Sequence, residues 1–224
     1  MTSESEPYAP QVPEDGELSE LELEALVHDG ELSGFSADDC QVPERQARGL
    51  IAEGGAMRRV DLSSSVLDNG RFTDLVLTQC NLSNLRSRAS NLTRVGFQGC
   101  RLTGMSLTDS VLHDVTFRDC RVDLSSFALS RLKRVRFEGC HLVGISLMEA
   151  SCEAVRFEGC EMTNCDLRGA SLAGCEFSGT DLAGVEGIEG LRGARFEWGD
   201  IIQMAGVWAA ALGIELIASE EDDR

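Results

Sequence analysis

Large apolar residues recur at every fifth position through the middle of this 224-residue chain. The series runs from Leu62 to Leu182, and Ser87 is its one plainly polar member. Two positions before each large residue the side chain is usually small or aliphatic, and the other positions of each five are mostly polar or glycine. Neither a helix, with a period of about 3.6, nor a flat strand, with a period of about 2, produces this spacing.

A second period of twenty residues contains four of these fives. It is marked by a column of cysteines at Cys80, Cys100, Cys120, Cys140 and Cys160. A fixed period of this size is typical of stacked repeats, so four fives predict one four-sided coil. Stacked coils place like residues above one another in parallel sheets with rungs about 4.8 Å apart, which predicts an all-β solenoid with interior ladders of large residues. One such ladder would consist of Phe97, Phe117, Phe137, Phe157 and Phe177.

The five-residue pattern resembles that of the pentapeptide-repeat family, A/C/S/V-D/N-L/F-x-x. Residues 80–84 (CNLSN) and residues 165–169 (CDLRG) match it, and the resemblance extends over residues 60–184. It implies a right-handed quadrilateral β-helix. Because one fold serves many functions, the resemblance does not by itself assign an activity.

The pattern divides the chain into three parts, of which the first is residues 1–31. This part is acidic, and we expect a disordered tail followed by a short helix that begins at a capping box at residues 19–22 and ends at Gly30. The apolar face of this helix would consist of Leu18, Leu21, Leu26 and Val27. The helix would either dock on the β-helix or bind a partner. Residues 32–190 are assigned to the β-helix, with irregular first coils because the period is weak there.

Residues 191–224 are assigned to a C-terminal cap, a dimerisation element and an acidic tail. Apolar residues take a helical spacing over residues 198–212, with an expected kink at Gly206 and an end at Gly213. An open end of a β-helix exposes unpaired backbone groups and the apolar core, so we expect this helix to cover it.

The C-terminal cap carries more apolar residues than one covering stripe requires, and such a surplus is typical of an interface. We therefore expect a homodimer joined through this region. Its candidate interface residues are Ile201, Met204, Val207, Trp208, Leu212 and Ile214. In the alternative, residues 214–217 form a short strand that folds back over the surplus and leaves a monomer.

Charge is unevenly distributed within the formal net charge of −18. Residues 1–53 contain 14 acidic and 2 basic residues, residues 186–224 contain 9 and 3, and the body between them contains 15 of each. Stacking by twenty gathers the basic residues of the body into columns. These columns are either part of a mixed-charge soluble surface or a docking patch for an anionic partner, the chain's own acidic tail included. The candidate docking residues are Arg118, Arg121, Arg131, Lys133, Arg134, Arg136 and Arg156.

The candidate chemistry of the chain is sparse. Cysteines stacked in a packed core act as small hydrophobic residues, and their arrangement suits neither zinc nor disulfides. His28, His113 and His141 are isolated from any nucleophile or ligand pattern, and no phosphate-binding or hydrolase motif occurs. We therefore expect no enzyme activity, cofactor, metal or small-molecule substrate. The absence of a long apolar run and of a signal-peptide pattern predicts a cytoplasmic location without membrane contact.

Two functions remain open on the sequence alone. The first is a protein-interaction scaffold with an unidentified protein partner, because a long rod offers flat, regular faces. The second follows from the resemblance to the quinolone-resistance and self-immunity members of the family, which implies a DNA-mimicking dimer that engages DNA gyrase or topoisomerase. In that group the C-terminal capping region forms the dimer contact. Neither function involves direct binding of nucleic acid.

Overall fold

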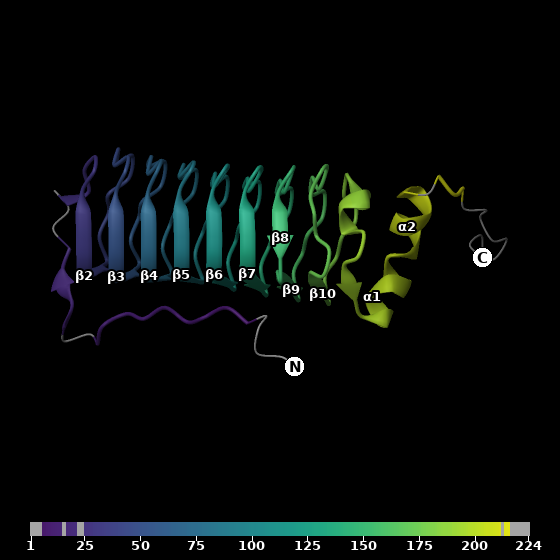
Figure 1. Cartoon of the computed structure of the whole chain (residues 1–224), viewed down its shortest axis with the longest axis horizontal. Coiled ribbons are helices and arrows are strands. Elements are labelled where there is room, and N and C mark those ends of the chain that lie inside the picture. Colours follow the sequence, from purple (N-terminus) through teal and green to yellow (C-terminus); the bar gives the residue numbers. More distant parts are fainter. Residues whose placement is uncertain (1–5, 15–16, 22–24, 212, 216–224) are drawn as a thin grey trace, which may run out of the picture.

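The chain folds into a rod of stacked coils (Figure 1), seen in a computed structural model that describes residues 6–14, 17–21, 25–211 and 213–215. Its eight-residue strands are β2 (Glu31–Asp38), β3 (Ile51–Arg58), β4 (Arg71–Thr78), β5 (Asn91–Gln98), β6 (Val111–Arg118) and β7 (Arg131–Glu138). Each pairs in parallel with the next at a register of twenty residues, as Phe97 does with Phe117. Shorter strands continue the sheet as β8 (Ser151–Glu153), β9 (Arg156–Glu158), β10 (Glu176–Ser178) and β11 (Arg195–Phe196).

Each coil turns at four corners spaced five residues apart. In one coil, the corner residues Gln79, Asn84, Ala89 and Arg94 all have φ between 50° and 57°. This left-handed conformation bends the chain sharply and is unfavourable for most side chains, which explains why Gly99 takes the equivalent corner one coil later. Four such corners in twenty residues give the coil four sides, and the predicted quadrilateral β-helix is confirmed.

The interior of the rod follows the predicted phase. In the coil that contains Phe137, eight side chains point inward and each is at most 1% exposed. They are Cys120, Val122, Ser125, Phe127, Ser130, Leu132, Val135 and Phe137. The predicted phenylalanine ladder is present: the ring centroids of Phe117 and Phe137 lie 4.7 Å apart with planes 4° from parallel. The stacking continues through Phe177 to Phe196, so ring spacing and rung spacing match.

The small interior positions also form hydrogen bonds. Many donate from the side chain to the carbonyl oxygen of a large interior residue 23 positions earlier, as Ser125 does to Leu102 at 2.7 Å. Cys120 makes the same bond to Phe97 at 3.5 Å. Cysteine, serine and threonine fit this position because each combines a small volume with a donor. The described cysteines are free thiols, and burial raises the pKa of Cys165 and Cys175 to about 11, which keeps both protonated at neutral pH.

The N-terminal end of the rod is closed by a strand rather than by a helix. Ser19–Glu20 form β1, which pairs in parallel with β2, and Leu21 and Leu26 are buried beside it. Ala25 has a 3-10 conformation, and residues 28–29 form a turn. The predicted helix start is therefore wrong at Ser19 and Glu20, which are in a strand, and residues 22–24 lie outside the described part of the chain. The physical reason is the open edge of β2, whose backbone groups are satisfied by a parallel strand.

The prediction of a disordered tail is wrong for residues 6–14. This segment, called the N-terminal strap from here on, runs along the outside of the rod from the β2 end toward its middle (Figure 1). Residues 1–5 and 15–16 lie outside the described part of the chain. The contacts that hold the strap are described with the candidate surface below.

The C-terminal end is covered by short helices, as expected. The 3-10 helix η3 (Ile188–Leu191) and β11 lead into α1 (Trp198–Gln203) and α2 (Ala205–Ala211). Phe196 stacks on Phe177, and Trp208 packs edge-on against Phe196 with ring centroids 5.7 Å apart. The break in the predicted helix falls at Met204 and not at Gly206, because the Met204 side chain turns into the core and is buried. Residues 214–215 are not in a strand, and residues 216–217 lie outside the described part.

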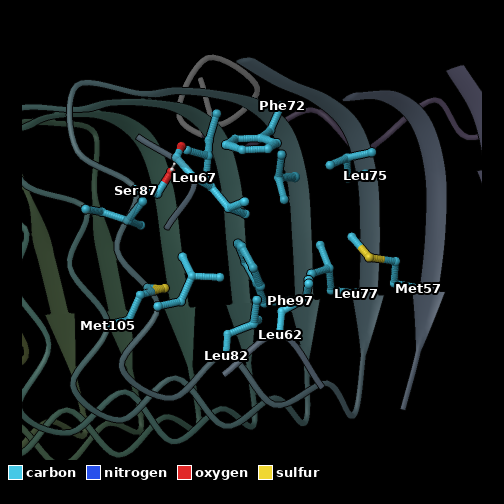
Figure 2. A pocket seen from close by; sticks show the side chains of 14 residues that line it. Met57, Leu62, Leu67, Phe72, Leu75, Leu77, Leu82, Ser87, Phe97 and Met105 are labelled. Carbon is cyan, nitrogen blue, oxygen red and sulfur yellow. Dashed lines mark hydrogen bonds between the residues drawn. The ribbon is translucent and has the colours of Figure 1, made fainter. Parts of the chain in front are cut away.

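A small apolar cavity lies where the phenylalanine ladder ends (Figure 2). Leu77 takes the ladder position next to Phe97, and Ser87 replaces the large residue of another ladder. Phe72, which also lines the cavity, turns its ring toward Gly70. These departures leave a void of about 60 Å³ that is lined almost entirely by apolar side chains. An apolar void of this kind stays dry and costs stability.

Replacing Phe137 with alanine should lower the free energy of unfolding by about 3–5 kcal/mol, because the stacked rungs cannot close around the lost ring. The exposed Arg101 provides the control, and Arg101→Ala should cost less than about 0.5 kcal/mol. Urea-induced unfolding measures both. Equal losses in the two variants would mean that the interior phase is wrong.

Leu77→Phe should raise the free energy of unfolding by about 1 kcal/mol, because the new ring extends the ladder into the cavity and removes empty volume. The matched control is Leu142→Phe, in a fully buried position that does not line the cavity, which should lose about 1–3 kcal/mol through overpacking. Thermal unfolding of both variants checks the difference in sign. A Leu77→Phe variant as unstable as the control would contradict the cavity.

Candidate protein-interaction surface

One corner of the coil carries a column of alternating charges. Successive coils place Asp74, Arg94, Asp114 and Arg134 at this corner, all with positive φ. Arg94 forms a bidentate ion pair with Asp74 at 2.6–2.7 Å, and Arg134 forms one with Asp114 at 2.7–2.8 Å. Both aspartates are buried, with exposures of 6% and 3%. We call these four residues the corner column.

The N-terminal strap is bound to this corner column through its backbone. The N–H of Gln11 donates to Asp74 Oδ1 at 2.8 Å, and the N–H of Tyr8 donates to Asp114 Oδ1 at 3.1 Å. The guanidinium carbon of Arg134 lies 5.2 Å from the centroid of the Tyr8 ring, within range of a cation–π contact. The aspartates therefore accept hydrogen bonds from an arginine of the rod and from the backbone of the strap at the same time.

The acidic end of the strap meets the arginines that the sequence predicts as a docking patch. Glu6 forms ion pairs with Arg136, at 3.3 Å, and with Arg156. Both arginines also contact rod carboxylates, Arg136 with Glu158 at 2.6 Å and Arg156 with Glu176 at 2.8 Å. Arg136 and Arg156 of the predicted patch are thus in contact with the chain's own N-terminal segment.

Docking of the strap changes the titration of the corner aspartates. The hydrogen bonds from Arg94 and from the Gln11 N–H hold the pKa of Asp74 below its ordinary value. For Asp114, burial raises the pKa, but the hydrogen bonds from Arg134 and the Tyr8 N–H outweigh it and the net pKa is lowered. Both carboxyls are therefore charged at neutral pH, which is the state that accepts N–H donors.

The remaining predicted docking residues are divided between the face of the strap and other faces of the rod. Arg118 lies beside the strap, where it lines the same hollow as Glu6 and Arg136. Arg118 pairs with Glu138 at 3.1 Å, Lys133 with Glu153 at 2.8 Å, and Arg121 with Asp123 at 2.8 Å on a different side of the coil. Arg131 lies exposed on β7. The structure therefore brings together Arg118, Arg134, Arg136 and Arg156 around the strap. It does not bring Arg121 to this corner.

The residues predicted for a dimer interface differ in how deeply the cap buries them. Met204 is buried, and Val207 and Trp208 are half-buried against the end of the core. Ile201 is half-buried and Ile214 is exposed, while Leu212 lies outside the described part. Two exposed side chains of α1 were not among the predicted residues, namely Trp198, 77% exposed, and Ile202, 59% exposed.

Sequence reasoning missed five residues of the strap contact. They are Glu6, Tyr8, Gln11, Asp74 and Asp114. The spacing of twenty within each Asp–Arg pair was a usable signal for the column, because it places Asp74 one coil before Arg94 and Asp114 one coil before Arg134. The strap side had no such signal, since its contacts follow no period in the sequence.

The histidines and cysteines form no reactive cluster in the described part of the chain. His113 Nε2 lies 2.6 Å from Arg134 Nη2, and His141 pairs with Glu161 at 3.0 Å. Across residues that the structure describes, no group of three or more His, Cys, Asp or Glu side chains could hold a metal ion. None of the helices among them has the length and apolar character needed to cross a membrane.

Two family models match the chain in sequence. One, described as a pentapeptide repeat region, matches residues 70–147, and the other, described as pentapeptide repeats in eight copies, matches residues 150–185. Together they span about half of the chain, in agreement with the coil register. The chain belongs to the pentapeptide-repeat family. Neither description names a catalytic activity.

Solved structures match this chain at low sequence identity and low TM-score. HetL, a pentapeptide repeat protein involved in heterocyst differentiation regulation from the cyanobacterium Nostoc sp. strain PCC 7120, is 13% identical, with 74% of this chain and 86% of HetL covered and a TM-score of 0.40. Full-length QnrB1, a plasmid-mediated fluoroquinolone resistance protein, is 15% identical, with 80% and 100% covered and a TM-score of 0.40. At these identities the likeness concerns the fold alone. None of the curated proteins matches this chain in sequence.

We expect the strap to leave the corner column as the pH falls below about 4. Arg94 and Arg134 already lower the pKa of Asp74 and Asp114, and the N–H groups of the docked strap lower it further. The free energy of docking is therefore fully present above the ordinary aspartate pKa of about 3.9 and is lost only at lower pH, as the two carboxyls become protonated. Tyr8 is the only tyrosine, so fluorotyrosine labelling gives one fluorine resonance that reports docking. Release at a pH between about 5 and 7 would contradict the assignment of these carboxyls.

Proposed function

We propose that this protein is a non-enzymatic scaffold that binds segments of other proteins along the outside of its rod. The observation that carries the proposal is the corner column with its strap. An extended polypeptide lies on the outer surface there, held by hydrogen bonds from its backbone to Asp74 and Asp114 and by ion pairs of Glu6. These contacts recognise the backbone N–H groups and one carboxylate of the strap. A segment of a partner chain offers the same groups.

The test of this proposal is a pull-down from an extract of the source cell. It compares the proteins retained by the natural chain with those retained by each of two matched variants. Arg136→Gln with Arg156→Gln removes two positive charges from the candidate surface, and Arg101→Gln with Arg121→Gln removes two from another face of the rod. We expect a protein that is retained by the natural chain and by the control but lost with the Arg136 and Arg156 variant. Retention that is unaffected by both changes would contradict binding at this corner. Equal melting temperatures establish that both variants are folded.

A second candidate function is binding of DNA gyrase by DNA mimicry. It is favoured by carboxylates that stack on successive coils in the C-terminal third, where Glu161 pairs with Asp181 and Asp166 with Glu186 at adjacent rungs. The rod compensates part of this charge, because Arg168 pairs with Asp166 at 2.7 Å and with Glu186 at 3.7 Å, and His141 pairs with Glu161 at 3.0 Å. The charge that is left is unfavourable for stability in stacked positions, so a purpose in binding would explain it. A supercoiling assay with purified gyrase, with and without a quinolone, tests this function. Unchanged supercoiling and unchanged quinolone inhibition at micromolar protein would exclude it.

We also propose that the protein is a homodimer joined at the C-terminal cap. Trp198, Ile202 and Ile214 are all more than half exposed there, and exposed apolar side chains gathered at one end of a rod favour a two-fold contact. Of the interface residues that the sequence suggested, Met204 is already used within the chain. Trp198 and Ile202 take its place in the proposed interface.

Ile202→Glu should dissociate the dimer, because a charge is placed in the apolar contact without disturbing the cap core. The control is Val27→Glu, since Val27 is also exposed but lies at the opposite end of the rod. Light scattering at micromolar concentration measures the mass. A mass near 24.2 kDa for the natural chain at every concentration would contradict the dimer.

A further inference from the structure

The strap and the corner column have matching repeat lengths. The prolines of the strap, Pro7, Pro10 and Pro13, are three residues apart. An extended polyproline-type segment advances about 3.1 Å per residue, or about 9.3 Å in three. Two coils of the rod advance about 9.6 Å, because neighbouring parallel strands lie about 4.8 Å apart. One proline-to-proline step therefore spans two coils almost without mismatch.

This match explains which backbone groups are bound. Tyr8 and Gln11 each follow a proline, and their N–H groups reach Asp114 and Asp74, which are two coils apart. The coil between them presents an arginine, which pairs with the neighbouring aspartate instead of meeting a strap N–H. At the next coil the corner residue is Gly54, and a Cβ there would lie 3.4 Å from the Pro13 ring. The column thus accommodates a proline-spaced backbone over several coils.

The surface beside the strap is larger than the strap requires. A hollow of about 290 Å³ lies next to Ala9 and Pro10. On the rod side it is bounded by Val76, Gly96 and Thr116 and by the side chains of Arg118 and Arg136. The side chain of Ala9 is small and exposed. A segment with a larger apolar residue at this place would bury more surface than the strap does.

We propose that the corner column is a recognition groove for extended, proline-spaced peptides and that the strap closes it in cis. The peptide it fits has prolines three residues apart, a free N–H after each of two prolines, an acidic residue at its N-terminal end for Arg136 and Arg156, and a large apolar residue where the strap has Ala9. This inference rests on the proposed scaffold function and names the partner class for one face. A tethered strap acts at an effective concentration on the order of millimolar. A free segment therefore displaces the strap only if it binds the groove more tightly than the strap does.

The test uses two variants of the full chain that differ in one feature. Tyr8→Pro with Gln11→Pro removes both bound N–H donors from the strap, because proline has none. Ala9→Pro adds a proline at a position whose N–H makes no bond in the structure, so it serves as the control. The probe is a fluorescein-labelled synthetic peptide with the sequence of residues 4–14, together with the same peptide carrying Ala9→Leu. Fluorescence anisotropy gives the Kd of each peptide for each protein.

We expect both peptides to bind the Tyr8→Pro, Gln11→Pro variant at least about tenfold more tightly than they bind the natural chain or the Ala9→Pro control, and the Ala9→Leu peptide to bind best. The fluorine resonance of fluorotyrosine-labelled natural chain should also move toward that of the free labelled peptide when excess Ala9→Leu peptide is added. Equal Kd values for all three proteins would overturn the proposal. Binding that is unchanged when the three prolines of the peptide are replaced by alanine would also overturn it, because charge alone would then suffice.

Two further outcomes distinguish the recognition groove from the proposed scaffold function and from the proposed dimer. The assay uses purified protein and synthetic peptide, so a negative result leaves a scaffold that binds through another face and rejects only the groove. If the Tyr8→Pro, Gln11→Pro variant loses a dimer that the natural chain and the Ala9→Pro control both form, the strap bridges two chains and closure in cis is wrong.

Discussion

The structure depends on the in-register stacking of coils, which brings every side chain within about 4.8 Å of its equivalents one coil before and one coil after. Inside the rod this repetition is favourable, because phenylalanine rings stack and small donors reach the carbonyl groups of the coil before them. Outside the rod it is a restriction. Two like unit charges at that distance repel by about 0.9 kcal/mol even in water, and a partly buried pair repels more strongly. A charged column on this fold is therefore most stable when its signs alternate.

The corner column shows how the chain satisfies this restriction. Each buried aspartate is paired with the arginine of the next coil, and the pairing leaves oxygen capacity on the aspartate for one more donor. The strap supplies that donor from its backbone. The equal numbers of acidic and basic residues in the body reflect this local pairing. The body has no net charge, but its surface carries a regular pattern of charged sites. The function proposed here resides in that pattern and not in the net charge.

The interior was predictable from the sequence because burial repeats at every coil. The phase of Phe137, the family and the covered C-terminal end all follow from the period of five. The strap was not predictable in this way, since the bonds from Tyr8 and Gln11 join residues 106 and 63 positions apart and occur once each. An acidic, proline-containing segment is typical of disorder, and it is the aspartates of distant coils that give it a fixed place. The helix expected near Leu21 failed for a related reason, because the open edge of β2 offered backbone pairing that outweighed the local helical pattern.

The shared repeat length of strap and rod limits how such a protein changes its size in evolution. Insertions and deletions in a solenoid normally remove or add one coil, with little effect beyond the two new neighbours. Beneath the strap, loss of one coil would present an arginine to an N–H that needs a carboxylate. Only the gain or loss of two coils at once, with three residues of strap, preserves every contact. The coils beyond Arg156 make no contact with the described part of the strap, so lineages of this protein are expected to vary in length at the C-terminal end of the rod and to keep the coils beneath the strap constant.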